Sequence, residues 1–306
     1  MPNEKMAAQM TSKPGFIAAL DQSGGSTPGA LRLYGIPDSE YGGDEAKMFK
    51  LMHEMRVRII TAPAFTGEKV VGTILFERTM DGEAQGMPVP TFLWEKRGVV
   101  PFVKVDKGLE SEKDGVRLMR PISDLDTLLS RAVKLGVYGT KMRSVIDHAS
   151  KAGIAAIVKQ QFEVASQIDA HGLMPIIEPE VSINSPDKAD AETILRDEIT
   201  RSVDALPAGR KVMLKLTIPT VPDLYLPLTK HPHVARVVAL SGGYKRDDAC
   251  RRLAQNHGMI ASFSRALVED LKVSMSDAEF HAALARAIDE IYQASTVKHS
   301  SATVQG

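Results

Sequence analysis

Lys215 lies in the middle of an apolar run, residues 212–218 (VMLKLTI), that predicts a parallel strand covered on both faces. Burying an ammonium group is costly, and a desolvated lysine generally responds with a lowered pKa. A lysine that is partly neutral near pH 7 attacks carbonyl carbon atoms and can form a Schiff base. Taken alone, Lys215 fits better on an exposed strand face, or with its ammonium group reaching the solvent at the edge of the sheet. The chemical interpretation therefore depends on the rest of the chain.

Polar residues also end the other apolar runs. Seven of eight such runs finish in charged, hydroxyl-bearing or glycine residues: Asp21; Lys104 and Asp106; Lys141 and Arg143; Glu178 and Glu180; Lys215; Ser241, Gly242 and Gly243; Ser264 and Arg265. One charge at a strand end is usually solvated, but seven such ends in register predict a shared site.

The central residues suit covalent chemistry on a carbonyl group. Lys141 near Lys215 would disfavour the protonated form of either, because like charges lower a lysine pKa. Carboxylates at Asp21 and Glu178 supply groups for proton transfer.

Two further sets suit phosphate. One is Ser241-Gly242-Gly243 with Ser264 and Arg265, after the last two strands, where barrels often hold phosphate. The other combines Ser23 and Ser26, in a Gly/Ser loop, with Lys104 and Arg143. That loop alone is a weak signal and fits a plain turn, since it lacks the Rossmann and P-loop patterns. Two anion sites around a Schiff-base lysine indicate a ketose with a phosphate at each end.

The elements that must position these residues alternate along the chain. Strands are predicted at 16–21, 70–77, 99–106, 137–143, 173–180, 212–219, 236–243 and 259–265. Helices are predicted at 44–56, 123–136, 154–170, 191–206, 247–257 and 276–292, the last opened by a Ser276–Glu279 capping box. The pattern predicts an α/β fold, a single (β/α)8 TIM barrel domain over 1–306. Residues 1–15 are expected to form an irregular or helical lead-in, and 295–306 an irregular tail.

Composition narrows the function classes. The 306 residues include 38 basic and 38 acidic side chains and one cysteine. The chain has no net positive charge that would indicate nucleic-acid binding, and it has no apolar segment long enough to span a membrane. The eight histidines are scattered apart from His231 and His233, which predicts no metal site. We expect a soluble cytoplasmic protein whose oligomeric state, monomer or homo-oligomer, stays open.

The motifs together resemble one family. They are AALDQS (18–23), VKVDKG (103–108), KMR (141–143), PIIEPE (175–180), LK (214–215), LSGG (240–243) and FSRAL (263–267), in family order. The chain resembles class I (Schiff-base) fructose-bisphosphate aldolase, in its short bacterial branch. The resemblance implies a metal-independent lyase of glycolysis and gluconeogenesis, with no cofactor and with sugar phosphates as partners. It would cleave fructose 1,6-bisphosphate reversibly to dihydroxyacetone phosphate and glyceraldehyde 3-phosphate.

The resemblance also implies residue roles. Lys215 would form the Schiff base, Glu178 would accept protons, and Asp21, Lys141 and Glu180 would complete the catalytic group. The phosphate next to the ketone would be held by Ser241, Gly242, Gly243, Ser264 and Arg265, and the far phosphate by Ser23, Ser26, Lys104 and Arg143.

The chain departs from the long family members at three points. Gln22 stands where they have an acid, Leu216 stands where they have proline, and no tyrosine follows Tyr292 near the C-terminus. Two alternatives remain at this point: another Schiff-base sugar-phosphate aldolase or transaldolase, or a catalytically silent barrel that acts as a scaffold.

Overall fold

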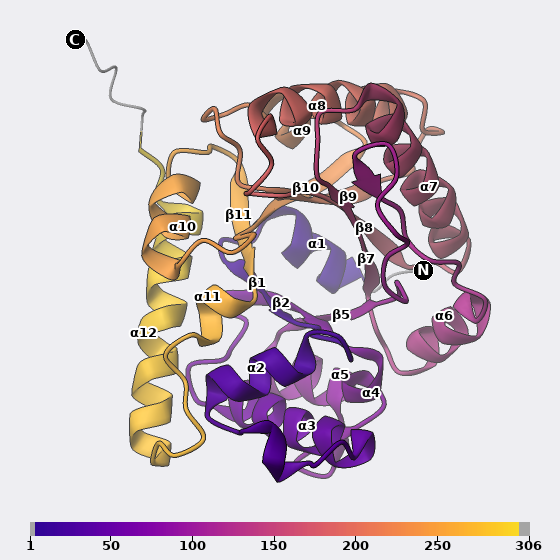
Figure 1. Ribbon diagram of the computed structural model, residues 1–306. Coiled ribbons are helices and arrows are strands. Elements are labelled where there is room, and N and C mark those ends of the chain that lie inside the picture. The colour runs from indigo at the N-terminus through magenta and orange to yellow at the C-terminus, as the bar shows by residue number, and fades with distance from the viewer. Residues whose placement is uncertain (1–3, 300–306) are drawn as a thin grey trace.

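Eight parallel strands close into a barrel in the computed structural model, which describes residues 4–299 (Figure 1). The strands are β1 (Phe16–Leu20), β2 (Val70–Leu75), β5 (Val100–Lys104), β7 (Gly139–Ile146), β8 (Met174–Val181), β9 (Val212–Thr217), β10 (Val234–Leu240) and β11 (Met259–Phe263). They run in the order β5-β2-β1-β11-β10-β9-β8-β7, and pairing of β5 with β7 closes the ring. The predicted TIM barrel is confirmed.

Helices surround the barrel. The longer ones are α2 (Thr27–Tyr34), α3 (Glu45–Thr61), α6 (Leu125–Lys134), α7 (Lys151–Ala170), α8 (Lys188–Asp204), α10 (Arg246–Leu253) and α12 (Asp277–Thr296). Short turns of helix are α4 (Glu77–Met80), α5 (Val89–Phe92), α9 (Leu226–Thr229) and α11 (Arg265–Val268), with a 3-10 turn at Asp38–Glu40 and a π turn at Leu93–Arg97. Strand β6 (Val116–Arg117) adds an antiparallel pair to β7, and β3 (Glu83–Ala84) pairs with β4 (Met87–Pro88).

Side-chain caps fix where several of these helices begin. Asp44 accepts a hydrogen bond from Lys47 N–H at the start of α3, and Ser150 accepts one from Gly153 N–H at the start of α7. The predicted capping box of Ser276 is present at the start of α12.

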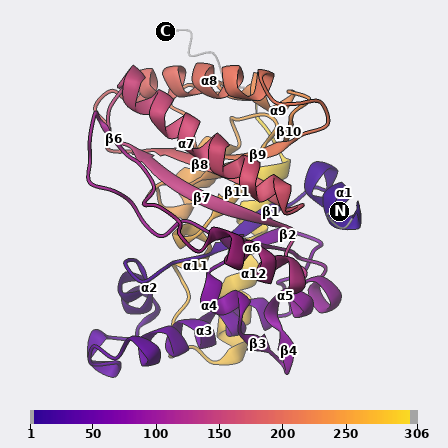
Figure 2. The ribbon, with the colours of Figure 1, turned by 90° about the vertical axis from the view of Figure 1, so that its right-hand side faces the viewer.

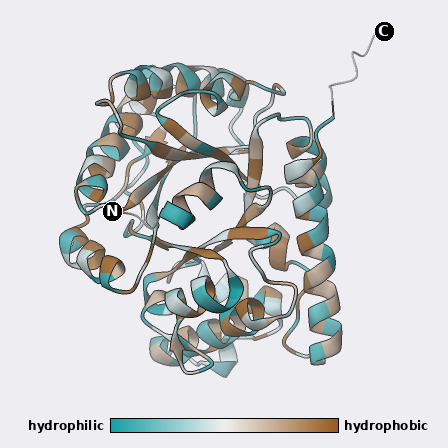
Figure 3. Cartoon of the chain, turned by 180° about the vertical axis from the view of Figure 1, so that it is seen from behind, coloured by the Kyte–Doolittle hydropathy of each residue, from teal (hydrophilic) through white to brown (hydrophobic). Residues whose placement is uncertain are grey.

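Helix α1 (Glu4–Ser12) fills the N-terminal end of the barrel. Seen from behind, it lies across the middle of the ring of mostly hydrophobic strands (Figure 3). Met6 and Met10 pack against inward-facing strand residues, and Gln9 Nε2 donates to the carbonyls of Val71 and Gly98, both at 2.8 Å. The lead-in is therefore helical over these residues.

The barrel interior explains where the charges lie. The layer of side chains nearer the N-terminal ends of the strands is an apolar cluster that includes Ala19, Phe102, Ile176 and Met213. Because strand side chains alternate in direction, the residues two positions further along each strand point into the same interior. Those residues are Asp21, Lys104, Glu178 and Lys215, so one charged layer rests on one apolar layer. In the side view, α1 lies at one end of the strands and the loops that carry β6 and α2 project at the other (Figure 2).

Several predicted boundaries need correction. Helix α6 begins at Leu125, after Asp124, and not at the Ser123 cap, and α8 is displaced toward the N-terminus relative to 191–206. The final helix continues to Thr296, so the first two residues of the predicted irregular tail are helical, while 300–306 lie outside the described residues. Between residues 4 and 299, no helix is both long and apolar enough to cross a membrane.

Candidate active site

A cavity of about 750 Å³ opens at the C-terminal ends of the strands. It brings together the residues predicted for the site: Asp21, Ser23, Ser26, Lys104, Lys141, Arg143, Glu178, Glu180, Lys215, Ser241, Gly242, Gly243, Ser264 and Arg265. Six cationic and four acidic side chains line it, with Arg32 and Asp106 as the additional charged members. The excess of positive charge suits an anionic ligand.

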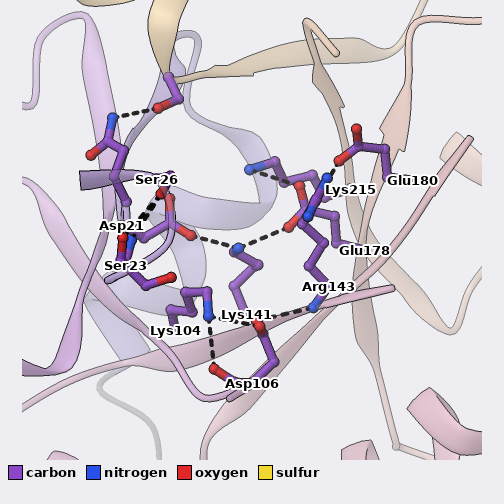
Figure 4. Close-up of polar contacts among 12 residues, drawn as sticks. Asp21, Ser23, Ser26, Lys104, Asp106, Lys141, Arg143, Glu178, Glu180 and Lys215 are labelled. Carbon is purple, nitrogen blue, oxygen red and sulfur yellow. Dashed lines mark hydrogen bonds and ion pairs between the residues drawn. The ribbon is translucent and has the colours of Figure 1, made fainter. Parts of the chain in front are cut away.

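Glu178 lies between the two lysines at the centre of the cavity. Its Oε1 is 3.2 Å from Lys215 Nζ, and its Oε2 is 2.9 Å from Lys141 Nζ. Lys141 Nζ is also 2.5 Å from Asp21 Oδ2, and Figure 4 shows Lys141 with a carboxylate on either side. Lys215 is only 4% exposed, so the reading of it as an exposed strand residue is wrong.

The charges of this cluster stabilise one another. Burial opposes ionisation of Asp21 and Glu178, but the neighbouring ammonium groups of Lys141 and Lys215 outweigh it and lower the pKa of both carboxyls. Burial also disfavours the charge on Lys141, but Asp21 and Glu178 outweigh it and raise the pKa of Lys141 above its ordinary value. The prediction that a neighbouring lysine lowers the pKa of Lys141 is therefore wrong, because two carboxylates lie closer to it.

Gln161, on α7, positions the central carboxylate from behind the strand. The main-chain N–H of Glu178 donates to Gln161 Oε1 at 2.8 Å, and Gln161 Nε2 donates to Ser144 Oγ at 3.0 Å. Gln161 is fully buried among the apolar residues of its helix face. The sequence reasoning missed it, although an amide within an apolar helical stripe was an available signal.

The cations nearer the rim are held by acids of their own. Lys104 Nζ lies 2.6 Å from Asp106 Oδ1, and Arg143 Nε lies 2.6 Å from Glu180 Oε2 (Figure 4). Asp106 Oδ2 also accepts the main-chain N–H of Arg143 at 3.2 Å, which links the ends of β5 and β7. Glu180, predicted among the catalytic groups, thus forms its ion pair with Arg143.

The turn after β10 needs glycine. Gly242 has φ +61° and Gly243 has φ +121°, both in the range that favours glycine. A Cβ atom on Gly242 would lie 2.7 Å from Ile183 Cγ2. Beside this turn, Arg265 is exposed, and among the cavity cations of the described chain it alone has no acidic partner within ion-pair distance. The turn and Arg265 therefore offer a site for an anion.

Within 4–299, no group of three or more His, Cys, Asp or Glu side chains is arranged to hold a metal ion. The two clustered histidines bond elsewhere: His231 Nε2 lies 2.9 Å from Asp204 Oδ1, and His233 Nδ1 lies 2.7 Å from the carbonyl of Arg210.

Comparison with known proteins identifies the family. The model of the family described as fructose-bisphosphate aldolase class-I matches residues 5–218. Fructose-bisphosphate aldolase class 1 of Synechocystis sp. is 55% identical over 294 residues, covering 96% of this chain and 98% of that protein. The chain belongs to the class I fructose-bisphosphate aldolase family. The family member of the same name from Porphyromonas gingivalis is also 55% identical, over 96% of this chain and 99% of its own.

Solved structures support the aldolase fold at lower identity. Fructose-bisphosphate aldolase from Plasmodium falciparum, in a complex with TRAP and a small-molecule inhibitor, is 20% identical with a TM-score of 0.74. The alignment covers 98% of this chain and 96% of that one. A Corynebacterium glutamicum protein is 15% identical with a TM-score of 0.56, over 95% of this chain and 92% of its own.

Proposed function

We propose that this class I aldolase cleaves fructose 1,6-bisphosphate through a Schiff base on Lys215. The observation that carries the proposal is the buried Lys215 Nζ at the floor of the cavity, 3.2 Å from Glu178 Oε1. A carboxylate at this distance can take the proton that the ammonium must lose before it attacks a ketone.

The proton transfers follow from the central cluster. Glu178 first takes the proton that the Lys215 ammonium loses, and Nζ then adds to the ketone carbon. Through Glu178, two protons in all pass from nitrogen to the former ketone oxygen: the first gives the carbinolamine hydroxyl and the second lets it leave as water, so that a protonated imine remains. Asp21 takes the proton of the hydroxyl on the carbon that becomes the aldehyde. The electrons of the breaking C–C bond pass into the protonated imine, and protonation and hydrolysis of the resulting enamine release dihydroxyacetone phosphate. Lys141 stays cationic and favours the ionised form of both carboxyls, so each is ready to accept a proton at its step.

The two phosphates bind on opposite sides of Lys215. The phosphate next to the ketone is bound by Arg265, by the hydroxyls of Ser241 and Ser264, and by the Gly242–Gly243 turn. The far phosphate takes Ser23, Ser26, Lys104 and Arg143. Lys104 and Arg143 each bring a paired acid, so the far site carries less net positive charge than its cations alone suggest. This second anion site favours a bisphosphate over a single-phosphate substrate.

The reaction belongs to glycolysis and gluconeogenesis in the cytoplasm and needs no metal. The test is the coupled release of both triose phosphates from fructose 1,6-bisphosphate, with and without EDTA. We expect turnover that EDTA leaves unchanged and that Lys215→Arg abolishes. Strong inhibition by EDTA, or turnover by the arginine variant, would contradict the proposal.

A further inference from the structure

Arg56 is a buried cation that lies behind the cavity wall and takes no part in the proton transfers described above. It stands on α3 and is 1% exposed. Its Nη1 donates to Thr79 Oγ1 at 2.7 Å, and its Nη2 donates to the main-chain carbonyl of Gln22 at 2.5 Å and to Gln22 Oε1 at 3.2 Å. Within residues 4–299 no carboxylate forms an ion pair with it. A buried guanidinium that bonds only neutral groups is costly, so its contacts point to a function.

The bond to Gln22 Oε1 decides which way the amide faces. Since Arg56 can only donate, it fixes the oxygen of the amide toward itself and turns Nε2 to the other side. There Gln22 Nε2 donates to Ser264 Oγ at 2.7 Å. A hydroxyl that accepts from an amide keeps its own proton free to donate. The Ser264 hydroxyl is thereby set up as a donor toward an anion in the cavity.

The bond to the Gln22 carbonyl acts on the other side of the cavity. Gln22 directly precedes Ser23, whose own carbonyl accepts hydrogen bonds from Ser26 N–H at 2.9 Å and Thr27 N–H at 2.8 Å. The loop that carries Ser23 and Ser26 therefore starts from a carbonyl that Arg56 holds in place.

We propose that Arg56 is a positioning residue that orients both phosphate subsites from behind the cavity. It acts on Ser264 through the side-chain amide of Gln22, and on the Ser23–Ser26 loop through the main-chain carbonyl of Gln22. The inference rests on the proposed function only for the identity of the ligands, since the contacts themselves are independent of turnover.

The experiment measures binding of dihydroxyacetone phosphate and of glyceraldehyde 3-phosphate separately, by calorimetry. Arg56→Met removes both branches and should weaken both triose phosphates about tenfold. Gln22→Met removes only the amide and should weaken dihydroxyacetone phosphate alone. Arg56→Lys keeps the positive charge but loses the two separate Nη donors of the guanidinium, so its affinities for the triose phosphates should fall between those of Arg56→Met and wild type.

Arg236→Met is the matched control. Arg236 is partly buried, and its guanidinium hydrogen bonds within residues 4–299 go to main-chain carbonyls, those of Met10 at 2.8 Å and Lys13 at 3.1 Å, at the opposite end of the barrel. Its loss should lower the unfolding temperature without changing either affinity.

The proposal is overturned if Arg56→Met binds both triose phosphates within about twofold of wild type, or no differently from the control. If Arg56→Met does not fold, Gln22→Met and Arg56→Lys decide: unchanged affinity for dihydroxyacetone phosphate in both overturns it. The experiment measures binding and not turnover. A wild-type protein that binds both triose phosphates without cleaving the bisphosphate would therefore contradict the proposed function, and the test of Arg56 would still be valid.

Discussion

Replacement of Glu178 by glutamine keeps the shape of the side chain and removes the carboxylate that lies between two ammonium groups. The side chain is buried, with oxygens 3.2 Å from Lys215 Nζ and 2.9 Å from Lys141 Nζ. An amide can neither take the proton of Lys215 nor return it to the carbinolamine. Loss of such a general acid–base group lowers kcat about 100- to 10,000-fold, or about 3 to 5 kcal/mol in activation free energy.

The same change also costs stability, which the assay must separate from catalysis. Lys141 keeps Asp21 at 2.5 Å, but Lys215 loses its carboxylate, so we expect a loss of about 1 to 3 kcal/mol in the free energy of unfolding. Glu192→Gln is the matched control. Glu192 is fully buried and accepts from Lys188 Nζ and Thr220 N–H, outside the cavity.

Coupled release of triose phosphates gives kcat, and thermal unfolding gives stability, for both variants. We expect Glu178→Gln to lose at least about 100-fold in kcat while the control loses stability alone. A kcat for Glu178→Gln within about fivefold of wild type, or an equal loss in both variants, would refute the proton-transfer role.

Three other changes test the surroundings of the lysine. Arg265→Ala should weaken dihydroxyacetone phosphate about 10- to 100-fold, because a charged donor to the phosphate is lost, and unchanged affinity would show that the subsite is misassigned. Gly242→Ala forces a side chain to φ +61° and against Ile183, so it should cost at least about 1 kcal/mol in unfolding free energy; an unchanged unfolding temperature contradicts the turn geometry. The pKa of Asp21 is lower in the folded protein than the ordinary pKa of an aspartate. Its ionised form therefore stabilises the fold at pH values above that ordinary pKa, and this stability is lost as the pH falls toward the lowered pKa. The gap in unfolding temperature between wild type and Asp21→Asn should therefore shrink below about pH 4, and a constant gap would rule out the ion pair with Lys141 as its source.

The barrel and the residues that line its cavity were predictable from particular residues. Apolar runs such as 212–218 alternate with amphipathic helices, and parallel strands bring their C-terminal ends to one face. Asp21, Glu178 and Lys215 each follow an inward apolar residue by two positions, so strand periodicity places them in one layer.

The pairing within that layer was not predictable, because periodicity gives the direction of a side chain but not the partner it meets across strands. Lys141 was expected to respond to the like charge of Lys215, and the closer Asp21 and Glu178 reverse the direction of its pKa shift. Arg56 was missed for a related reason. It falls on the buried face of α3 with Met52 and Ile59, and only the structure shows that its guanidinium reaches the loop after β1.

Borohydride reduction in the presence of dihydroxyacetone phosphate, followed by peptide mass mapping, tests the central claim most directly. Reduction of the imine fixes the triose phosphate covalently to the amine that formed it. We predict a single adduct, on Lys215, that is absent from Lys215→Arg. No adduct, or an adduct on Lys141 or another lysine, would contradict the assignment of the nucleophile while the barrel itself stands.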